Sequence, residues 1–184
     1  NAKVSVFKYD ETVTTKTLIE KITELNADPT VHGILIQRPV PEHIAIKQLE
    51  YLTDPKKDID GFHPNSPYTL PLPLAVIEIL GEIYTLSHPE LISGSSKDPA
   101  GFLNWLKNNN LVVIGKGETG GKPIITYCNK LGITPTIIDS KTPDPKAILK
   151  DADIIISAVG QVAVIKPDMI KKGFISYFLS NAVK

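Results

Sequence analysis

Cysteine is almost absent from this sequence, and so is any long apolar segment. The one cysteine, Cys128, has no second cysteine with which to form an internal disulfide, which is typical of a protein of the reducing cytosol. No apolar run reaches the ~20 residues that a membrane-spanning helix needs, and the first residues do not have the pattern of a signal peptide. We therefore expect a cytoplasmic protein that does not interact with membranes.

Neither sign of charge is in excess. Lys and Arg together number 20, as do Asp and Glu, so the formal net charge is +0. The sequence lacks the excess of basic residues that would predict binding to nucleic acid. It also lacks an acidic tail that would predict a basic partner. The length of 184 residues suits one or two domains, and a hydrophobic content of 42% is enough for a sizeable core.

The most informative stretch is Leu111–Pro123, which reads LVVIGKGETGGKP. It opens with four apolar residues, which is typical of a buried parallel strand, and Gly115, Gly117 and Gly120 then follow in the order G-x-G-x-x-G. Pro123 and the helical apolar pattern after it predict a helix. Strand, glycine loop and helix form the context that binds a dinucleotide, because glycines let the backbone approach the pyrophosphate and the helix start offers N–H groups.

The residues after this loop support a nucleotide-binding domain. Strands are predicted at Thr134–Ile138 and Asp153–Val159, and the first of them ends at Asp139, about 20 residues past the loop, where such folds place an acid on the ribose. Asp139 would repel a 2′-phosphate, whereas Lys116 and Lys141 could pair with one. We expect NAD or the use of both NAD and NADP. The alternative is a glycine turn in an α/β domain that binds nothing.

The segments on either side of this domain carry further elements. Helices are predicted from Pro71 and from Asp98-Pro99, and a short helix and a strand are predicted at Lys166–Lys172 and Phe174–Phe178. Cys128 lies in the apolar pattern of the helix after the glycine loop, which favours a buried structural thiol over a nucleophile.

The N-terminal part predicts a second α/β unit. Lys3–Phe7 alternates as a half-buried strand does, a helix capped by Thr14 or Thr15 follows, and Val31–Gln37 has the composition of a buried strand. Gln37 ends that strand where α/β folds place ligand-contacting groups, although the amide could equally well serve only the loop backbone.

A charged loop, DPKKDIDGFHP, lies further on and contains Asp58, Asp60 and His63. Such a loop is usually solvated. Its spacing matches no standard metal site, so no metal is expected.

Four motifs together resemble a known family. HGILIQRPVPEH, KKDIDGFHP, VVIGKGETGGKP and ADIIISAVG occur in the order found in the bifunctional methylenetetrahydrofolate dehydrogenase / methenyltetrahydrofolate cyclohydrolase family. The first two motifs are specific to that family, and the last two are shared with many Rossmann domains. The resemblance implies an α/β fold of two three-layer α/β units. Residues 1–70 would be the catalytic domain, and residues 71–184 a Rossmann-type NAD(P)-binding domain with a parallel sheet.

The resemblance also implies the chemistry and the site. Such enzymes oxidise 5,10-methylenetetrahydrofolate with NAD(P)+ and hydrolyse the methenyl product to 10-formyltetrahydrofolate, in one-carbon metabolism that feeds purine biosynthesis. A tetrahydrofolate derivative would be the substrate, and a homodimer is expected. Gln37 corresponds to the glutamine that bonds the catalytic lysine, Asp60 to the aspartate that binds the pterin-like ring, and Pro39 to a substrate contact. The expected cofactor-binding residues are Gly115, Lys116, Gly117, Thr119, Gly120, Asp139, Ser140 and Lys141.

The sequence departs from the family in several places. The family's Tyr-x-x-x-Lys motif, whose lysine handles the proton, has no counterpart here. The Pro-Cys-Thr-Pro turn is replaced by Leu70–Pro73, and the Arg-Ser pair after the first loop glycine by Lys116-Gly117. The segment Thr85–Asn110 is longer than usual, and FISYFLSNAVK replaces the usual last strand, so we expect a chain that is incomplete at both ends. Two alternatives stay open: another NAD(P)-dependent oxidoreductase, or a non-catalytic nucleotide-binding module.

Overall fold

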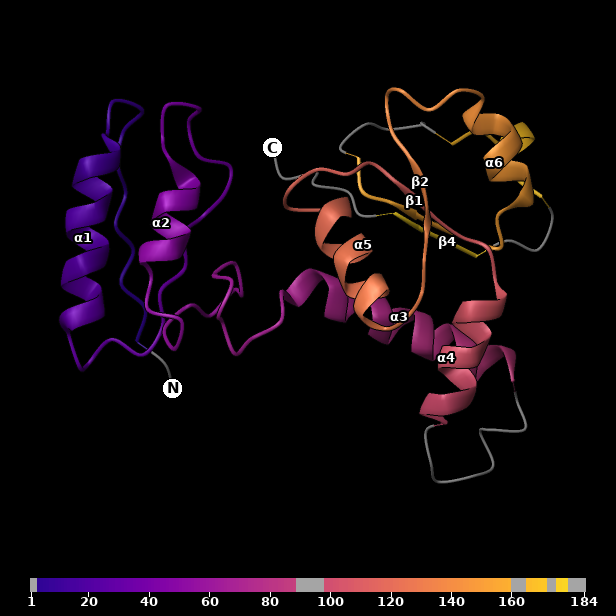
Figure 1. Cartoon of the computed structure of the whole chain (residues 1–184), viewed down its shortest axis with the longest axis horizontal. Helices are drawn as coiled ribbons and strands as arrows, with labels where there is room; N and C mark the ends of the chain where they lie inside the picture. Colours follow the sequence, from indigo (N-terminus) through magenta and orange to yellow (C-terminus); the bar gives the residue numbers. More distant parts are fainter. Residues whose placement is uncertain (1–2, 89–97, 160–164, 172–174, 179–184) are drawn as a thin grey trace. The chain divides into compact units, whose positions relative to one another are not determined.

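Two compact units make up the chain, Asn1–Pro71 and Leu72–Lys184. The computed structural model describes residues 3–88, 98–159, 165–171 and 175–178 (Figure 1). No helix within these described ranges is both long enough and apolar enough to cross a membrane.

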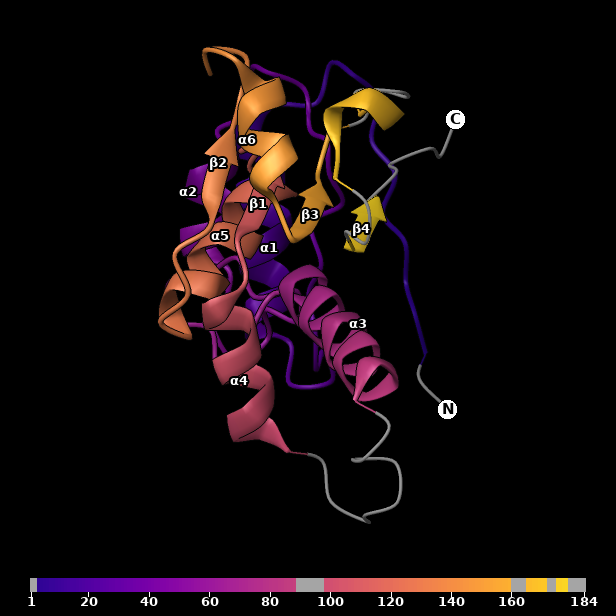
Figure 2. The ribbon, with the colours of Figure 1, turned by 90° about the vertical axis from the view of Figure 1, so that its right-hand side faces the viewer.

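A four-stranded parallel sheet organises the second unit. Its order is β2-β1-β3-β4, and all three neighbouring pairs are parallel, so the strands point the same way in Figure 2. The strands are β1 (Leu111–Ile114), β2 (Thr136–Ile138), β3 (Ile154–Ser157) and β4 (Ile175–Phe178). Each falls within a stretch where the sequence predicts a strand, and the predicted parallel sheet is confirmed.

Helices cover both faces of this sheet, which is why its two central strands are buried and, apart from Ser157, apolar. Every residue of β1 and β3 is buried. One face packs against α3 (Pro71–Ser87), α4 (Pro99–Asn108) and α5 (Gly121–Lys130), and the other against α6 (Pro145–Asp151). Figure 1 shows α5 and α6 on opposite sides of the sheet. A parallel strand covered in this way reads as a continuous hydrophobic run.

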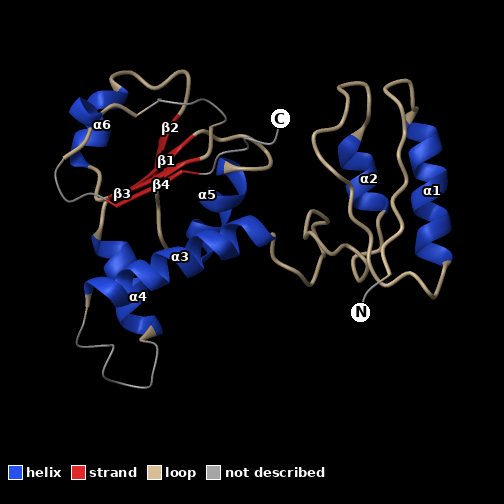
Figure 3. Cartoon of the chain, turned by 180° about the vertical axis from the view of Figure 1, so that it is seen from behind, coloured by secondary structure: helices blue, strands red, loops and turns tan. Residues whose placement is uncertain are grey.

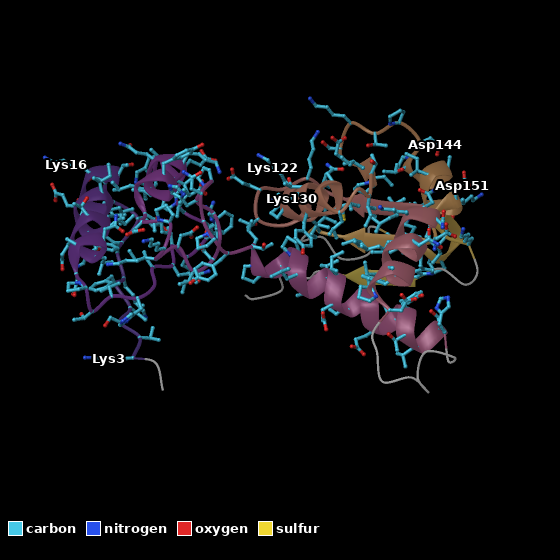
Figure 4. All side chains as sticks on the ribbon, turned by 60° about the horizontal axis from the view of Figure 1, so that its bottom comes forward. Lys3, Lys16, Lys122, Lys130, Asp144 and Asp151 are labelled. Carbon is cyan, nitrogen blue, oxygen red and sulfur yellow. The ribbon has the colours of Figure 1, made fainter. Side chains whose placement is uncertain are left out.

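Local capping fixes where two of these helices begin. Asp98 accepts a hydrogen bond from the Gly101 N–H at 2.9 Å, and Asp144 accepts one from the Ala147 N–H at 3.1 Å. A proline follows each aspartate, and it suits the first turn because its missing N–H would have no partner there. Figure 4 labels Asp144 and Asp151 at the two ends of α6, and Lys122 and Lys130 on α5.

Over its described residues, 3–71, the first unit consists of two helices and long loops (Figure 3). Helix α1 (Thr15–Ala27) is capped by Thr14, whose hydroxyl accepts from the Thr17 N–H at 3.2 Å. Helix α2 (Ile46–Leu52) packs against it through a buried cluster. The buried members of that cluster are Ile22, Ile44 and Leu49.

The strands predicted for the first unit are wrong as paired strands. Within the described residues, neither Lys3–Phe7 nor Val31–Gln37 forms a ladder, and Ile34 alone makes a parallel bridge, to Asp58. A strand needs a neighbour to bond its N–H and C=O groups, and the bridge supplies one only at Ile34. Val4 and Val6 accordingly remain 78% and 72% exposed. An alternating pattern in the sequence does not reveal whether a partner strand is present.

The helix predicted at Lys166–Lys172 is also wrong. The described residues contain only a 3₁₀ turn, Pro167–Met169, closed by a bond from the Met169 N–H to the Lys166 carbonyl at 2.9 Å. Ile170 then returns to extended backbone, so the turn does not propagate into an α-helix.

Candidate functional site

Parallel pairing brings the glycine loop next to the end of β2. Ile114, the last residue of β1, pairs with Ile138, the last residue of β2, and the Gly115 N–H donates to the Ile138 carbonyl at 2.8 Å. The next residues in the two segments are Lys116 and Asp139, and their side chains form an ion pair of 2.5 Å. Residues 23 positions apart in the sequence therefore meet at the carboxyl end of the sheet, where open α/β sheets bind ligands.

Asp139 is held in place by its own loop as well as by Lys116. Its Oδ1 accepts from the Lys141 N–H at 2.9 Å and from the Thr142 hydroxyl at 3.2 Å. The hydrogen bond from Lys116, followed by the bond from the Lys141 backbone, lowers the pKa of Asp139 to about 2. The carboxylate is thus ionised and oriented, which suits it to accept from a ribose hydroxyl.

Two glycines in the loop have opposite surroundings. A Cβ placed on Gly117 would meet nothing within 4 Å, whereas one on Gly121 would lie 1.8 Å from the Gly115 carbonyl oxygen. Gly121 is therefore needed for packing the start of α5 against the end of β1. The fold does not require a glycine at position 117. A glycine there would, however, let a ligand approach the backbone closely.

The start of α5 can receive an anion. Its N-cap, Gly120, has no side chain that could cap the first-turn N–H groups. The Lys122 N–H bonds the Gly117 carbonyl at 3.1 Å and Pro123 has no N–H, so an anion here would rely on Gly121 and the loop. The start of α5 and the open space at Gly117 fit a dinucleotide pyrophosphate.

The remaining predicted cofactor residues lie at the same end of the sheet. Thr119 is exposed in the glycine loop, and Ser140 and Lys141 are exposed in the turn after β2. Lys141 contacts Asp139 through its backbone N–H. Cys128 is 1% exposed, and its burial raises the pKa of the thiol to about 11, so the expectation of a structural cysteine is confirmed.

A second group of polar residues surrounds a small pocket in the first unit. The pocket is lined by Ile34, Ile36, Arg38, Glu50, Thr53, Asp58, Asp60 and Phe62. Arg38 forms an ion pair with Glu50, which is 3% exposed and also bonds Lys47 at 2.7 Å. The Arg38 guanidinium stacks on the Phe62 ring, 3.8 Å from its centroid. The buried charge of Glu50 is thereby paired with two cations, as a buried carboxylate requires.

The loop that carries the pocket aspartates is anchored at both ends. Lys57 donates to three carbonyls at the end of α1, at 2.7 to 3.0 Å, and so satisfies groups that a helix terminus leaves open. Gly61 has a φ of +77°, and a Cβ there would lie 2.8 Å from the Tyr68 carbonyl oxygen. The turn after Asp60 therefore requires glycine.

The two aspartates of this loop have opposite protonation behaviour. Asp58 is 3% exposed, and although burial opposes its charge, bonds from Asp60 and from the His63 and Phe62 N–H groups lower its pKa. The pKa of Asp60 is raised to about 7, first by desolvation and then by its hydrogen bond to Asp58 and the charge of Asp58. Two neighbouring carboxyl groups resist ionising together, so the proton resides on Asp60.

Gln37 is not brought to this pocket. Ile36 and Arg38 line the pocket, but Gln37 between them is not among the residues that line it. Gln37 is exposed, and its amide donates to the Arg38 carbonyl at 2.9 Å. Pro39 is exposed as well.

Sequence reasoning missed Arg38 and Glu50 of the pocket and one glycine of the loop, and it considered Asp58 only as a metal ligand. Arg38, Glu50 and Asp58 contribute to the charge balance of the pocket, and Gly121 to the loop. The signals were an arginine directly after Gln37, a glutamate among the apolar positions of α2, and the doubled glycine. Among the described residues, no group of three His, Cys, Asp or Glu side chains could hold a metal ion.

Comparisons with known proteins match both units. Residues 1–60 match the model "Tetrahydrofolate dehydrogenase/cyclohydrolase, catalytic domain", and residues 103–176 match the model of the NAD(P)-binding domain of the same enzymes. The Bifunctional protein FolD 2 of Desulfitobacterium hafniense is 37% identical over 161 residues, which are 87% of this chain and 53% of that protein.

Solved structures are similar over most of the chain. The methylenetetrahydrofolate dehydrogenase of the silkworm Bombyx mori gives a TM-score of 0.73 at 32% identity, covering 91% of this chain and 58% of that one. The FolD enzyme of Campylobacter jejuni gives 0.72 at 31% identity, covering 90% and 56%. The chain thus spans little more than half the length of the relatives it matches.

Removing the Asp60 carboxyl should change how stability depends on pH. Its folded-state pKa is raised, so between about pH 4 and 7 the unfolded chain releases this proton while the folded chain keeps it, and the wild type loses stability as pH rises. Asp60→Asn removes that loss and keeps a hydrogen bond to Asp58. The free energy of unfolding of the variant, relative to wild type, should rise by on the order of 1–2 kcal/mol between pH 4.5 and 7.5.

Urea unfolding followed by circular dichroism at both pH values measures this difference. Asp28→Asn is the matched control, because the pKa of Asp28 is lowered by bonds from Thr30, so this carboxyl group stays ionised over this range. A difference between Asp60→Asn and wild type that is the same at both pH values would show that Asp60 is ionised throughout.

Proposed function

Because the chain belongs to the tetrahydrofolate dehydrogenase/cyclohydrolase family, we propose that it carries part of the machinery of a one-carbon folate enzyme. The activity proposed for the complete protein is the NAD(P)-dependent oxidation of 5,10-methylenetetrahydrofolate to 5,10-methenyltetrahydrofolate. Hydrolysis of that product to 10-formyltetrahydrofolate is the second proposed activity, and purine biosynthesis is the pathway it would supply.

One observation carries the proposal. The models of both domains of these enzymes match this chain in order, and the second match contains a glycine loop built at the carboxyl end of a parallel sheet. The open space at Gly117 and the oriented carboxylate of Asp139 support dinucleotide binding by this chain itself.

The roles proposed for individual residues follow from their chemistry. Asp60, once ionised, can accept paired N–H bonds from the pterin-like ring, with Gln37 and Pro39 as further substrate contacts. The cofactor contacts are Gly115, Lys116, Gly117, Thr119, Gly120, Asp139, Ser140 and Lys141. NAD(P)+, when bound, supplies the hydride acceptor. The residues of this chain would bind and orient the two ligands.

Further proposals concern the protein's location, its oligomeric state and its domain limits. We propose a cytoplasmic homodimer with no nucleic-acid partner, on the basis of the balanced charge, the single cysteine and the family. Domain limits of 1–70 for the catalytic part and 71–184 for the NAD(P)-binding part are proposed with them.

A second candidate function is a nucleotide-binding module without folate chemistry. The exposure of Gln37, and its bond to the neighbouring carbonyl, favour this candidate because a catalytic amide would engage a reacting partner. An unrelated NAD(P)-dependent oxidoreductase is the third possibility. If neither Gln37→Ala nor Asp60→Ala changes folate affinity, these candidates gain over the first.

Substitution of Gly117 should weaken dinucleotide binding without destabilising the fold. Gly117→Val places a β-branched side chain where the structure has free space, so unit 2 should keep its stability while NAD+ affinity falls more than tenfold, about 1.4 kcal/mol or more. Calorimetric titration with NAD+ measures the affinity. Gly81→Ala, whose Cβ would lie 4.0 Å from the Phe102 ring, is the matched control and should bind as wild type does. Unchanged affinity in a folded Gly117→Val would count against the fingerprint.

Choice of cofactor should depend on the Lys116–Asp139 pair. The wild type should bind NAD+ at least as tightly as NADP+, because Asp139 repels a 2′-phosphate and engages Lys116. Asp139→Ala removes the repulsion and releases Lys116, so affinity for NADP+ relative to NAD+ should rise roughly tenfold or more. The control is Asp168→Ala, which breaks the equally short Lys146–Asp168 pair. A clear wild-type preference for NADP+ that persists in Asp139→Ala would contradict this account.

The 184 residues alone should catalyse the hydrolysis step weakly or not at all. Attack of water on the methenyl carbon needs a group that handles a proton, and the amide of Gln37 does not titrate usefully near neutral pH. Such assistance is typically worth ~10²–10⁴-fold in rate. Loss of methenyltetrahydrofolate absorbance in the presence of the chain should therefore barely exceed the spontaneous rate, and a longer protein with Tyr-x-x-x-Lys upstream should be active. Robust turnover by the 184 residues would mean that the proton carrier lies among them.

A further inference from the structure

The segment Lys3–Tyr9 has the sequence of a strand and an open backbone. Among the described residues, no backbone hydrogen bond, ladder or isolated bridge includes any of its members. Each of its residues is exposed. An unpaired stretch of this kind presents a row of N–H and C=O groups to which a further strand can bond.

The path of this segment shows that its backbone is extended. In Figure 1 the indigo trace that leads into α1 runs past the whole length of that helix. Helix α1 has 13 residues, so it is about 20 Å long. The few residues before the turn at Glu11 cover that length only if each of them advances much further than the ~1.5 Å of a helical residue.

The apolar side chains of the segment differ in how much they are covered. Phe7 and Tyr9 are 47% and 43% exposed, and the Lys21 ammonium of α1 lies 4.3 Å from the centroid of the Phe7 ring. Val4 and Val6 are 78% and 72% exposed. The unit therefore leaves two β-branched side chains in water beside an open backbone edge.

The segment is complementary to a second copy of itself in one antiparallel register. When the numbers of facing residues sum to 13, Val6 lies opposite the partner's Phe7, and Val4 lies opposite the partner's Tyr9. Facing residues share one side of a strand pair, and β-branched side chains pair well with aromatic rings. A shift by one residue places the valines on the side away from the partner's rings.

The charges of the segment favour the same register. Lys3 then lies opposite the partner's Asp10. Asp10 accepts from the Thr12 N–H at 2.8 Å and from the Thr12 hydroxyl, both through Oδ1, and no described residue bonds its Oδ2. The register in which facing numbers sum to 11 puts Lys3 opposite the partner's Lys8, and like charges directly opposite each other destabilise a strand pair.

We propose that residues 3–10 form a self-association surface, at which two copies of this chain pair antiparallel with Val6 opposite the partner's Phe7. The pairing is two-fold symmetric, so each contact occurs twice. It rests on the homodimer proposed above, to which it gives a surface, and it needs neither folate nor dinucleotide. Because small interfaces bind weakly, we expect a Kd between about 10 μM and 1 mM.

Sedimentation velocity of the 184-residue chain over this concentration range measures the association. Wild type should change from monomer to dimer, and Val6→Asp, which puts a carboxylate against the partner's Phe7, should weaken the dimer more than tenfold. Leu86→Asp is the matched control, because Leu86 is 73% exposed but lies in α3, and it should associate as wild type does. A wild type that is monomeric throughout overturns the proposal. A dimer that Val6→Asp leaves intact also overturns it, while the proposed homodimer stands with its interface elsewhere.

Exchange of charges tests the register. Lys3→Asp puts two carboxylates opposite each other at both ends of the pair, and Asp10→Lys does the same with two ammonium groups, so each should weaken the dimer roughly tenfold. Both changes in one chain restore opposite charges, and the Kd should return to within about threefold of wild type. Lys8→Asp, the same change of charge opposite the partner's Ser5, should weaken the dimer far less than Lys3→Asp. Failure of the double variant to recover, or equal weakening by Lys8→Asp, would overturn the proposal.

Discussion

Backbone pairing of β1 with both β2 and β3 is the constraint on which the nucleotide site depends. Ile114 pairs with Ile138 on one side and with Ser157 on the other, so the three strands end at the same level. That alignment places the glycine loop beside Asp139 and allows the Lys116 ion pair to form. Both faces of the pairing strands are covered by helices, and this apolar burial stabilises a site whose own groups are polar and largely exposed.

In the first unit, contacts made by buried charged groups hold the loop of the candidate site in place. Its apolar core is small, and the loop from Asp54 to His63 is held by polar contacts: Lys57 to the end of α1, and Asp58 to backbone N–H groups. A protonated Asp60 beside an ionised Asp58 costs stability at neutral pH. A group that destabilises the fold and lies in a pocket is a candidate for function, because such pKa shifts gather at functional sites.

The sequence predicts the second unit better than the first, for a physical reason. A parallel strand buried on both faces is encoded in four consecutive apolar residues, and Gly115 and Gly117 mark the loop that follows, so strand, loop and helix can be recognised locally. Lys3–Phe7 has the alternation of a strand, but pairing depends on residues far away in the sequence, and the described residues supply no ladder there. The Arg38–Glu50 pair and the Asp58–Asp60 proton also escaped prediction, because they arise from tertiary contacts that leave no local pattern.

The central claim is that this chain binds a dinucleotide at the carboxyl end of the β2-β1-β3 sheet. Titration of the ¹⁵N-labelled chain with NAD+, followed by backbone amide NMR, tests it most directly. Binding at this site should give saturable shifts concentrated in Gly115–Gly121 and Asp139–Lys141, the two segments joined by the Lys116–Asp139 pair. Absence of shifts at millimolar NAD+, or shifts confined to residues outside both segments, would contradict the account.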